Sequence, residues 1–255
     1  GIFTAWGMAT AYSALVMFYA CGALLTFAIT RMQSAAPLSS PPAATRKFRP
    51  FRDLADGLAC IWHTPALLAA MWLAVLVNFT AFPISHGLLP YVAREVYQIG
   101  QSGLGGLVAS FAGGALLGST AIIFLADRIP AGRLMLGCTA LWYAALLGMA
   151  QVETAGLGRL LLGFAGFVQS LSMIALAVML LRTTSAELRG RVMGVRMLAT
   201  CTLPIGLVTA GALIRRFGYE PTVTFYAVSG LVLTAASAVR WRACLLTGPG
   251  AGAAP

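Results

Sequence analysis

Residues 96–126 have the sequence VYQIGQSGLGGLVASFAGGALLGSTAIIFLA, which contains no Asp, Glu, Lys or Arg. A helix that crosses a bilayer needs roughly 20 predominantly apolar residues, so this stretch is long enough to span one. Comparable uncharged stretches recur along the chain, at 2–30, 57–93, 134–152, 160–181, 197–214 and 221–239. Their positions predict seven spanning helices, near 8–30, 66–89, 103–126, 133–151, 157–181, 190–214 and 220–240.

The composition explains why lipid must surround much of this chain. Apolar residues make up 59% of the 255 residues and charged residues 9%, whereas a soluble domain carries about 25% charged residues. The uncharged stretches lack the polar stripe of a soluble amphipathic helix and the short alternating pattern of a membrane β-strand. We therefore expect an all-α fold, a polytopic membrane helical bundle.

The net charge of +10 is distributed unevenly between the two sides of the predicted bundle. If Arg31 is cytoplasmic, 13 of the 17 basic residues lie on that side and 4 on the other. This asymmetry follows the positive-inside rule and predicts an external N-terminus and a cytoplasmic C-terminus. The basic surplus thus indicates orientation and attraction to anionic lipid headgroups, not nucleic-acid binding.

The longest polar segment, 31–52, separates the first predicted helix from the others. It contains four prolines, several serines and five basic residues, a composition typical of a flexible linker. Two interpretations stay open, an ordinary long loop and a hinge that rests on the inner leaflet. After it, Asp53 is expected to cap a short helix whose apolar face lies in the membrane interface. That face contains Leu54, Leu58, Ile61 and Trp62.

Small residues recur every four positions along the predicted helix 103–126. This spacing lets two helix backbones approach closely in lipid. The contact can be static packing or a face that slides during a conformational change, and the two are compatible. The residues concerned are Gly106, Ser110, Gly114 and Gly118.

The end of that helix, Leu125-Ala-Asp127-Arg128-Ile-Pro-Ala-Gly-Arg133, resembles the loop signature of the major facilitator superfamily. It departs from the pattern because Pro130 and Ala131 stand where one residue is usual, and a final basic pair is lacking. In the family, such charges lock neighbouring helices on the cytoplasmic side. The resemblance therefore implies a gating role for Asp127, Arg128 and Arg133.

A second segment, Glu187-Leu-Arg189-Gly-Arg191-Val-Met-Gly, is similar to the start of the eleventh helix in exporter-like members of the same superfamily. Thr184 and Glu187 also have the spacing of a capping box that would begin a helix. The closest similarity is to the branch of enterobactin exporters, or transmembrane secretion effectors. By this resemblance Glu187, Arg189 and Arg191 join the gating charges.

The resemblance extends over residues 53–240 and implies a division of the whole chain. Residues 1–30 would hold the last helix of an N-terminal half, and 31–52 the cytoplasmic linker. Residues 53–240 would form the C-terminal six-helix bundle, and 241–255 a disordered cytoplasmic tail. The partners implied are membrane lipid, a small-molecule substrate and the missing N-terminal half, in a bacterial-type inner membrane. Siderophore, drug and metabolite export all stay open.

Polar groups within the predicted spans are candidates for a substrate path, because polar side chains in lipid face the bundle interior. Asn78, Phe82 and Ser85 share one helix face, and Pro83 interrupts the backbone hydrogen bonding beside them. Each candidate is also explained as interhelical packing, and His86 as a titrating group or a hydrogen-bonded interface residue. The full set of candidates is Asn78, Phe82, Ser85, His86, Gln169, Ser172, Thr200 and Thr202.

Competing functional classes find less support in the sequence. The two histidines cannot form a His-Glu-x-x-His zinc motif, and no nucleophile elbow or Walker lysine is present. We therefore expect no enzyme, no metal and no cofactor. No predicted span has a central carboxylate, so proton coupling would need an acid in the missing half, or His86. A non-transporting membrane fragment or interaction partner and a seven-helix receptor-like protein are the alternatives.

Overall fold

The computed structural model describes residues 2–35, 50–125 and 128–246, and near the two ends of these ranges it describes only the backbone of some helical residues. Contacts divide the chain into two units, Gly1–Arg49 and Pro50–Pro255. The first unit contains one long helix, α1 (Ile2–Ala35). Its described side chains are exposed over residues 15–31, as expected for an apolar helix considered by itself.

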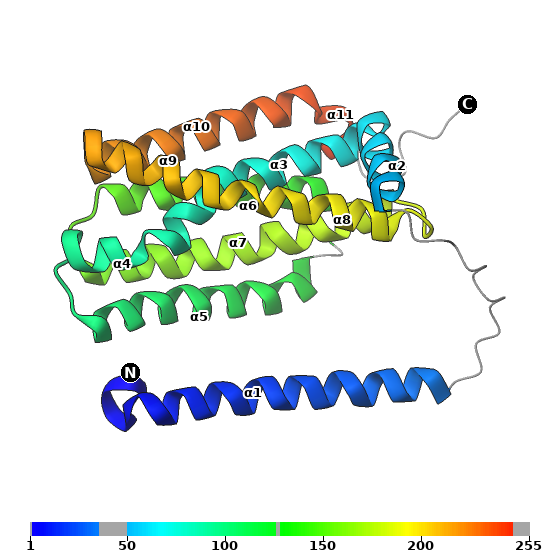
Figure 1. Ribbon diagram of the computed structural model, residues 1–255. Coiled ribbons are helices and arrows are strands. Elements are labelled where there is room, and N and C mark those ends of the chain that lie inside the picture. Colours follow the sequence, from blue (N-terminus) through cyan, green and yellow to red (C-terminus); the bar gives the residue numbers. More distant parts are fainter. Residues whose placement is uncertain (1, 36–49, 126–127, 247–255) are drawn as a thin grey trace. The chain divides into compact units, whose positions relative to one another are not determined.

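The second unit is a bundle of helices, in which the described residues form no strand (Figure 1). The short helix α2 precedes the long ones, and α11 follows them. The elements are α2 (Pro50–His63), α3 (Pro65–Phe82), α4 (Leu89–Tyr91), α5 (Gln101–Leu125), α6 (Ala131–Ala150), α7 (Ala155–Thr183), α8 (Arg189–Thr200), α9 (Thr202–Phe217), α10 (Tyr219–Arg240) and α11 (Arg242–Leu246).

Six helical segments of the described chain are long and apolar enough to cross a membrane. They match the last six predicted spans, with ends that differ by a few residues. The first predicted span lies in α1, whose described apolar part, Leu15–Arg31, is shorter than these six. The segments are Pro65–Val96, Gln101–Leu125, Ala131–Ala150, Ala155–Thr183, Arg189–Phe217 and Tyr219–Arg240.

Two of the six spans are irregular. Pro65–Val96 contains π-helical turns at Pro83–Gly87 and Val92–Val96, which carry it beyond the predicted end at residue 89. Pro83 has no N–H, so it cannot donate to the preceding turn of the helix. In the turn that follows, the Leu88 N–H donates to the Pro83 carbonyl at 2.9 Å, five residues back, which is the bond of a π-helix. Arg189–Phe217 is interrupted at Cys201, close to Pro204, which likewise removes a backbone donor.

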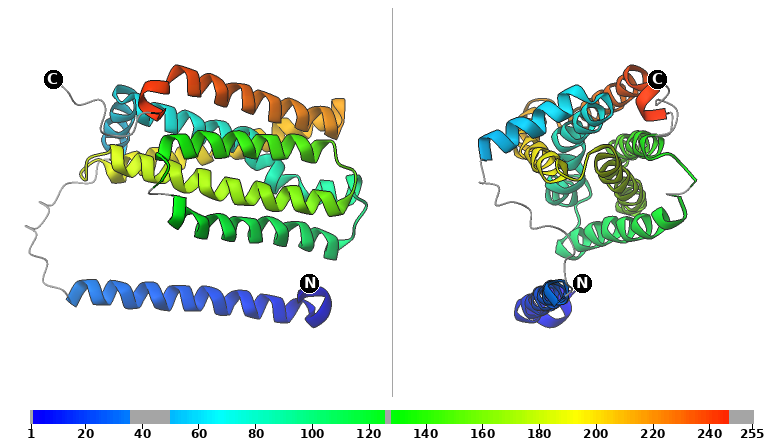
Figure 2. Two further views of the ribbon diagram at one scale, coloured as in Figure 1. Left: turned by 180° about the vertical axis from the view of Figure 1, so that it is seen from behind. Right: turned by 90° about the vertical axis from the view of Figure 1, so that its right-hand side faces the viewer.

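The six spans form two groups of three with reciprocal contacts. The first group consists of α3, α5 and α6, and the second of α7, α8–α9 and α10. Helix α5 of the first group packs on α7, and α8–α9 of the second group pack on α3. Helices α6 and α10 pack on each other. Helix α6 also contacts α7, and α10 also contacts α3. Because three crossings separate corresponding helices, α3 and α7 run in opposite directions (Figure 2). The two groups thus share one pattern of contacts, with corresponding helices antiparallel.

Glycines allow both of these cross-group contacts. A Cβ atom on Gly114 of α5 would overlap the carbonyl of Gly163 in α7, and one on Gly118 would overlap that of Phe167. In the other pair, a Cβ atom on Gly206 of α9 would overlap the carbonyl of Phe79 in α3. The predicted packing stripe on residues 103–126 therefore lies against α7, where small residues let the backbones meet.

Two expectations about the ends of the bundle need correction. Asp53 does not cap α2, because the helix begins three residues earlier at Pro50, whose fixed φ suits the first helical position. In the expected interfacial face of α2, Ile61 is buried whereas Leu54, Leu58 and Trp62 are exposed. The sequence predicts a disordered tail over 241–255, but residues 242–246 form helix α11, which packs on α6 at Gly132. Residues 247–255 lie outside the described chain.

Adjacent glycines of α5 provide a matched test of this packing. Gly114→Ala should destabilise the bundle by about 1–3 kcal/mol, because the neighbouring backbone carbonyl cannot move aside as a side chain can. Gly113→Ala should be neutral or slightly stabilising, because nothing lies within 4 Å of its added Cβ. Thermal or denaturant unfolding of both variants in detergent measures the difference, and equal stabilities would contradict the contact.

Candidate functional site

An ion-pair cluster joins α2 to the start of α8. Arg191 contacts Asp53 through Nη2 at 2.8 Å and Asp56 through Nη1 at 2.8 Å. The Arg191 side chain is 12% exposed, and the two carboxylates are 30% and 42% exposed. One guanidinium thus binds two acids in a partly dry setting, where charge-assisted hydrogen bonds are stronger than at an open surface.

The sequence around the cluster explains how α2 and α8 come together. Asp53 and Asp56 are three residues apart, so they lie on one face of α2 and can both reach one partner. Gly57 follows them, and a Cβ there would stand 3.0 Å from the Arg191 carbonyl oxygen. A larger residue at Gly57 would push α8 away from the two carboxylates.

The other described gating residues suggested by the resemblance have different surroundings. Arg189 donates from Nε to the carbonyls of Leu181 and Thr184, and so satisfies the end of α7. Arg128, Arg133 and Glu187 are exposed, and Asp127 lies outside the described residues. Among these gating residues, Arg191 is bound to two carboxylates, those of Asp53 and Asp56.

The predicted capping box at this position is wrong. Thr184 lies at the C-terminal end of α7, where its hydroxyl donates to the Leu180 carbonyl at 2.7 Å. The following helix, α8, has Leu188 at its N-cap position with no side-chain cap. The backbone carbonyl of Ser185 accepts the N–H groups of Leu188 and Arg189 instead.

Deeper in the bundle, hydroxyl and indole groups connect neighbouring spans. Trp142 of α6 donates from Nε1 to the Ser85 hydroxyl at 3.1 Å. Tyr143 and Thr80 share a hydrogen bond of 2.6 Å between α6 and α3. Thr139 and Ser172 share another of 2.6 Å between α6 and α7, and the Ser172 hydroxyl also donates to the Met135 carbonyl at 3.3 Å. These buried bonds make α6 the helix that ties α3 and α7 together.

Aromatic rings continue this polar seam toward the bundle surface. The Phe82 ring lies 5.2 Å from that of Trp142 in an edge-on arrangement and 5.3 Å from the His86 imidazole. His86 in turn contacts Phe111 of α5 at 4.7 Å, again edge-on. Phe82 is half-buried and His86 exposed, so their rings remain accessible to a ligand at the side of the bundle.

The eight candidate residues for a substrate path differ in their hydrogen bonds and in their exposure. Ser85 and Ser172 are fully buried in interhelical bonds, and the Asn78 amide donates to the Ala74 carbonyl at 2.8 Å. The hydroxyl of Thr202 donates to backbone carbonyls of α3 and α8. Thr200 is exposed and bonds its own helix. Gln169 is half-buried on α7.

Sequence reasoning identified parts of both clusters but not their partners. The sequence predicts a helix cap at Asp53, although two acids at helical spacing, Asp53 and Asp56, also favour an ion pair. Trp142 and Phe111 carry no distinctive sequence signal, because large aromatic residues are common in membrane helices. Their hydrogen-bonding and ring contacts depend on tertiary placement, which hydropathy alone does not contain.

Comparison of the chain with protein-family models, with curated proteins and with solved structures gave no match. The class of protein follows from the helices themselves. Six described segments have the length and composition of membrane spans, and they are joined by short connections. The chain is a multi-pass α-helical membrane protein.

The ion-pair cluster makes a prediction about α2. Arg191→Gln should leave two neighbouring carboxylates without their cation and loosen α2, with an expected cost of roughly 1–3 kcal/mol. Hydrogen–deuterium exchange of the α2 amides should accelerate by about tenfold, because 1.4 kcal/mol corresponds to a factor of ten. Arg182→Gln, the same charge change at an exposed site on α7, serves as the control. Unchanged exchange in the Arg191 variant would contradict the role of the cluster.

Proposed function

We propose that this chain is the C-terminal part of a secondary active transporter that exports a small molecule by alternating access. The observation that carries the proposal is the reciprocal packing of two three-helix groups. In transporters built from inverted repeats, substrate sites form near the membrane midplane at the interface between repeats. In this proposal the contact of α3 with α8–α9 would be such an interface.

The irregular spans support the same interpretation, because interrupted helices commonly form the substrate sites of transporters. The π-helical turn at Pro83–Gly87 and the interruption at Cys201 belong to two spans that pack on each other. Phe82 and His86 stand at the first of these irregularities. They are the residues of this seam that we propose to contact a solute, by ring stacking and by hydrogen bonding.

The distribution of charge supports an orientation. The end of the bundle that carries α2 and α11 also carries most of the arginines, including Arg128, Arg133 and Arg191, and we assign it to the cytoplasm by the positive-inside rule. The cluster of Asp53, Asp56 and Arg191 then lies at the cytoplasmic end. It would hold the helix after the linker against α8 and limit how the two halves rock.

An efflux assay tests the proposed function directly. In cells that lack their own exporters, the 255-residue chain would be compared with a reading frame extended upstream by five further spans. Export by the extended form alone is the expected result, because alternating access needs an opposing bundle. Export by the short chain alone would overturn the need for a second half. Failure of both forms on a broad panel of siderophores, drugs and metabolites would overturn the export proposal.

The loop after α5, which resembles the major facilitator signature, provides a second test. Asp127→Asn in the extended form should reduce transport by about tenfold, the effect of losing roughly 1.4 kcal/mol of charge interaction in one conformational state. Membrane insertion, followed by the amount of protein in the membrane fraction, should not change. Normal efflux at normal membrane levels would remove the gating role from Asp127.

A further inference from the structure

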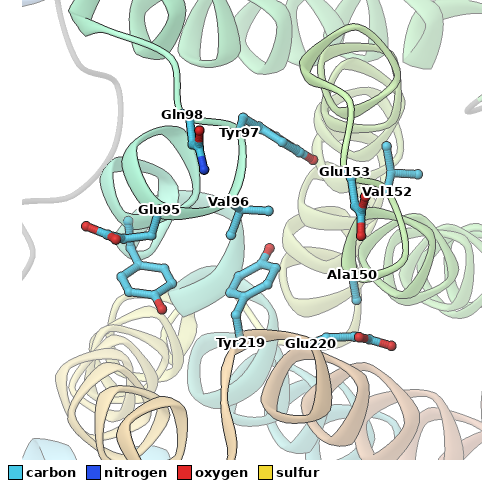
Figure 3. Close-up of a pocket in the computed structure, with 10 residues that line it drawn as sticks. Glu95, Val96, Tyr97, Gln98, Ala150, Val152, Glu153, Tyr219 and Glu220 are labelled. Atoms are coloured by element: carbon cyan, nitrogen blue, oxygen red, sulfur yellow. The ribbon is translucent and has the colours of Figure 1, made fainter.

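Opposite the arginine-rich end, three chain segments line an open cavity of about 560 Å³ (Figure 3). They are the end of the first span, the α6–α7 connection and the start of α10. Its volume lies within the range of small-molecule sites, roughly 300–1,000 Å³. Its lining includes Tyr91, Glu95, Tyr97, Glu153, Tyr219 and Glu220.

The lining is acidic in a chain that is otherwise basic. The protein has only 7 acidic residues and a net charge of +10, yet Glu95, Glu153 and Glu220 all line this one cavity, and no Lys or Arg does. Glu95 lies to one side and bonds Arg94 at 3.3 Å. Glu153 and Glu220 both lie on the other side, and the lining contains no cation (Figure 3). They place two carboxylates beside the cavity.

Two tyrosine hydroxyls in the same lining are buried and have no hydrogen-bond partner, namely those of Tyr97 and Tyr219. Tyr97 is only 8% exposed, and a Cβ on Gly158 would overlap its hydroxyl, so the ring is held in place against α7. Burial raises the pKa of Tyr97 above its ordinary value of 10.0, so the hydroxyl stays neutral. Buried polar groups nearly always have partners, and these two lack one among the residues that the structure describes.

The aromatic rings complete the chemistry of the cavity. Tyr91 and Tyr219 are stacked with ring centroids 6.0 Å apart, and both line the cavity. Tyrosine faces attract cations through the ring quadrupole. The part of the chain that the structure describes has no cluster of three or more His, Cys, Asp or Glu groups suited to a metal ion. The cavity is thus better matched to an organic cation than to a metal.

We propose that this cavity binds a primary ammonium ligand, with Glu153 and Glu220 as counter-ions and the Tyr97 and Tyr219 hydroxyls as hydrogen-bond acceptors. A primary ammonium group carries three donors, which suits an array of carboxylates and phenols. Two carboxylates on one side of the cavity favour a ligand with two ammonium groups. The site lies at the end of the bundle that we assign to the outside, away from the aromatic seam of the spans.

Calorimetric titration of the 255-residue chain in phosphatidylglycerol nanodiscs tests the proposal without requiring transport. The probe is 1,4-diaminobutane, and 1,4-butanediol is its neutral counterpart of the same length. The diamine should bind and the diol should not. Equal heats for the two, or Mg²⁺ binding as tightly as the diamine at matched ionic strength, would overturn the proposal.

Variants identify the groups responsible. Glu153→Gln with Glu220→Gln should weaken diamine binding by at least about tenfold, because charge-assisted hydrogen bonds are lost. Glu95→Gln, the matched charge change at an acid that bonds Arg94, should change it by less than about twofold. Tyr97→Phe should weaken binding by about threefold, the effect of one neutral hydrogen bond. An unchanged affinity in both the double variant and the Tyr97 variant would overturn the assignment, provided that circular dichroism confirms their folding.

The ammonium group can belong to a free solute or to a lipid headgroup. Replacing part of the phosphatidylglycerol by phosphatidylethanolamine distinguishes these sources. A fall in apparent diamine affinity, absent from the Glu153→Gln/Glu220→Gln variant, would assign the cavity to the lipid amine. An unchanged affinity would assign it to a soluble amine.

Discussion

The close approach of helix backbones at glycine is the constraint on which the rest of this bundle depends. Lipid tails are as apolar as leucine side chains, so membrane helices associate through packing and hydrogen bonds, not through a hydrophobic force between them. Gly114 lets α5 meet α7, and Gly206 lets α9 meet α3. Each contact joins a helix of one three-helix group to a helix of the other. The two groups therefore cannot separate without losing the packing that holds each of them.

The acidic residues discussed above lie away from these glycine contacts. The spans keep their ionic groups near the ends, and the acids are concentrated at two places. Asp53 and Asp56 bind Arg191 at the arginine-rich end, whereas Glu153 and Glu220 line the cavity at the opposite end. An acid beside an arginine stabilises a helix contact, but an acid without a cation in its cavity creates an attractive potential for one. The same residue type thus has a structural role at one end and a proposed recognition role at the other.

The sequence predicts the last six spans well, because a run without charge long enough to cross a bilayer has few other stable structures. It also predicts that small residues of α5 form a packing face. It does not reveal that Pro83 leads to a π-helical turn, since a proline can kink, break or widen a helix according to its neighbours. Nor does it give the partner of Asp56, because Arg191 lies 135 residues away and only the tertiary fold brings them together. The acidic cavity escapes prediction for the same reason, because its residues come from three separate segments.

The use of polar groups within the spans limits how this bundle can recognise a solute. Ser85, Thr139 and Ser172 already hydrogen-bond neighbouring helices, and breaking such bonds would leave unsatisfied groups in a dry interior. The groups that remain accessible along the seam are the rings of Phe82 and His86. A solute in contact with the seam would therefore be selected mainly by shape and ring stacking. If the proposed transport takes place, selection by charge would have to occur at the acidic cavity and not at the seam.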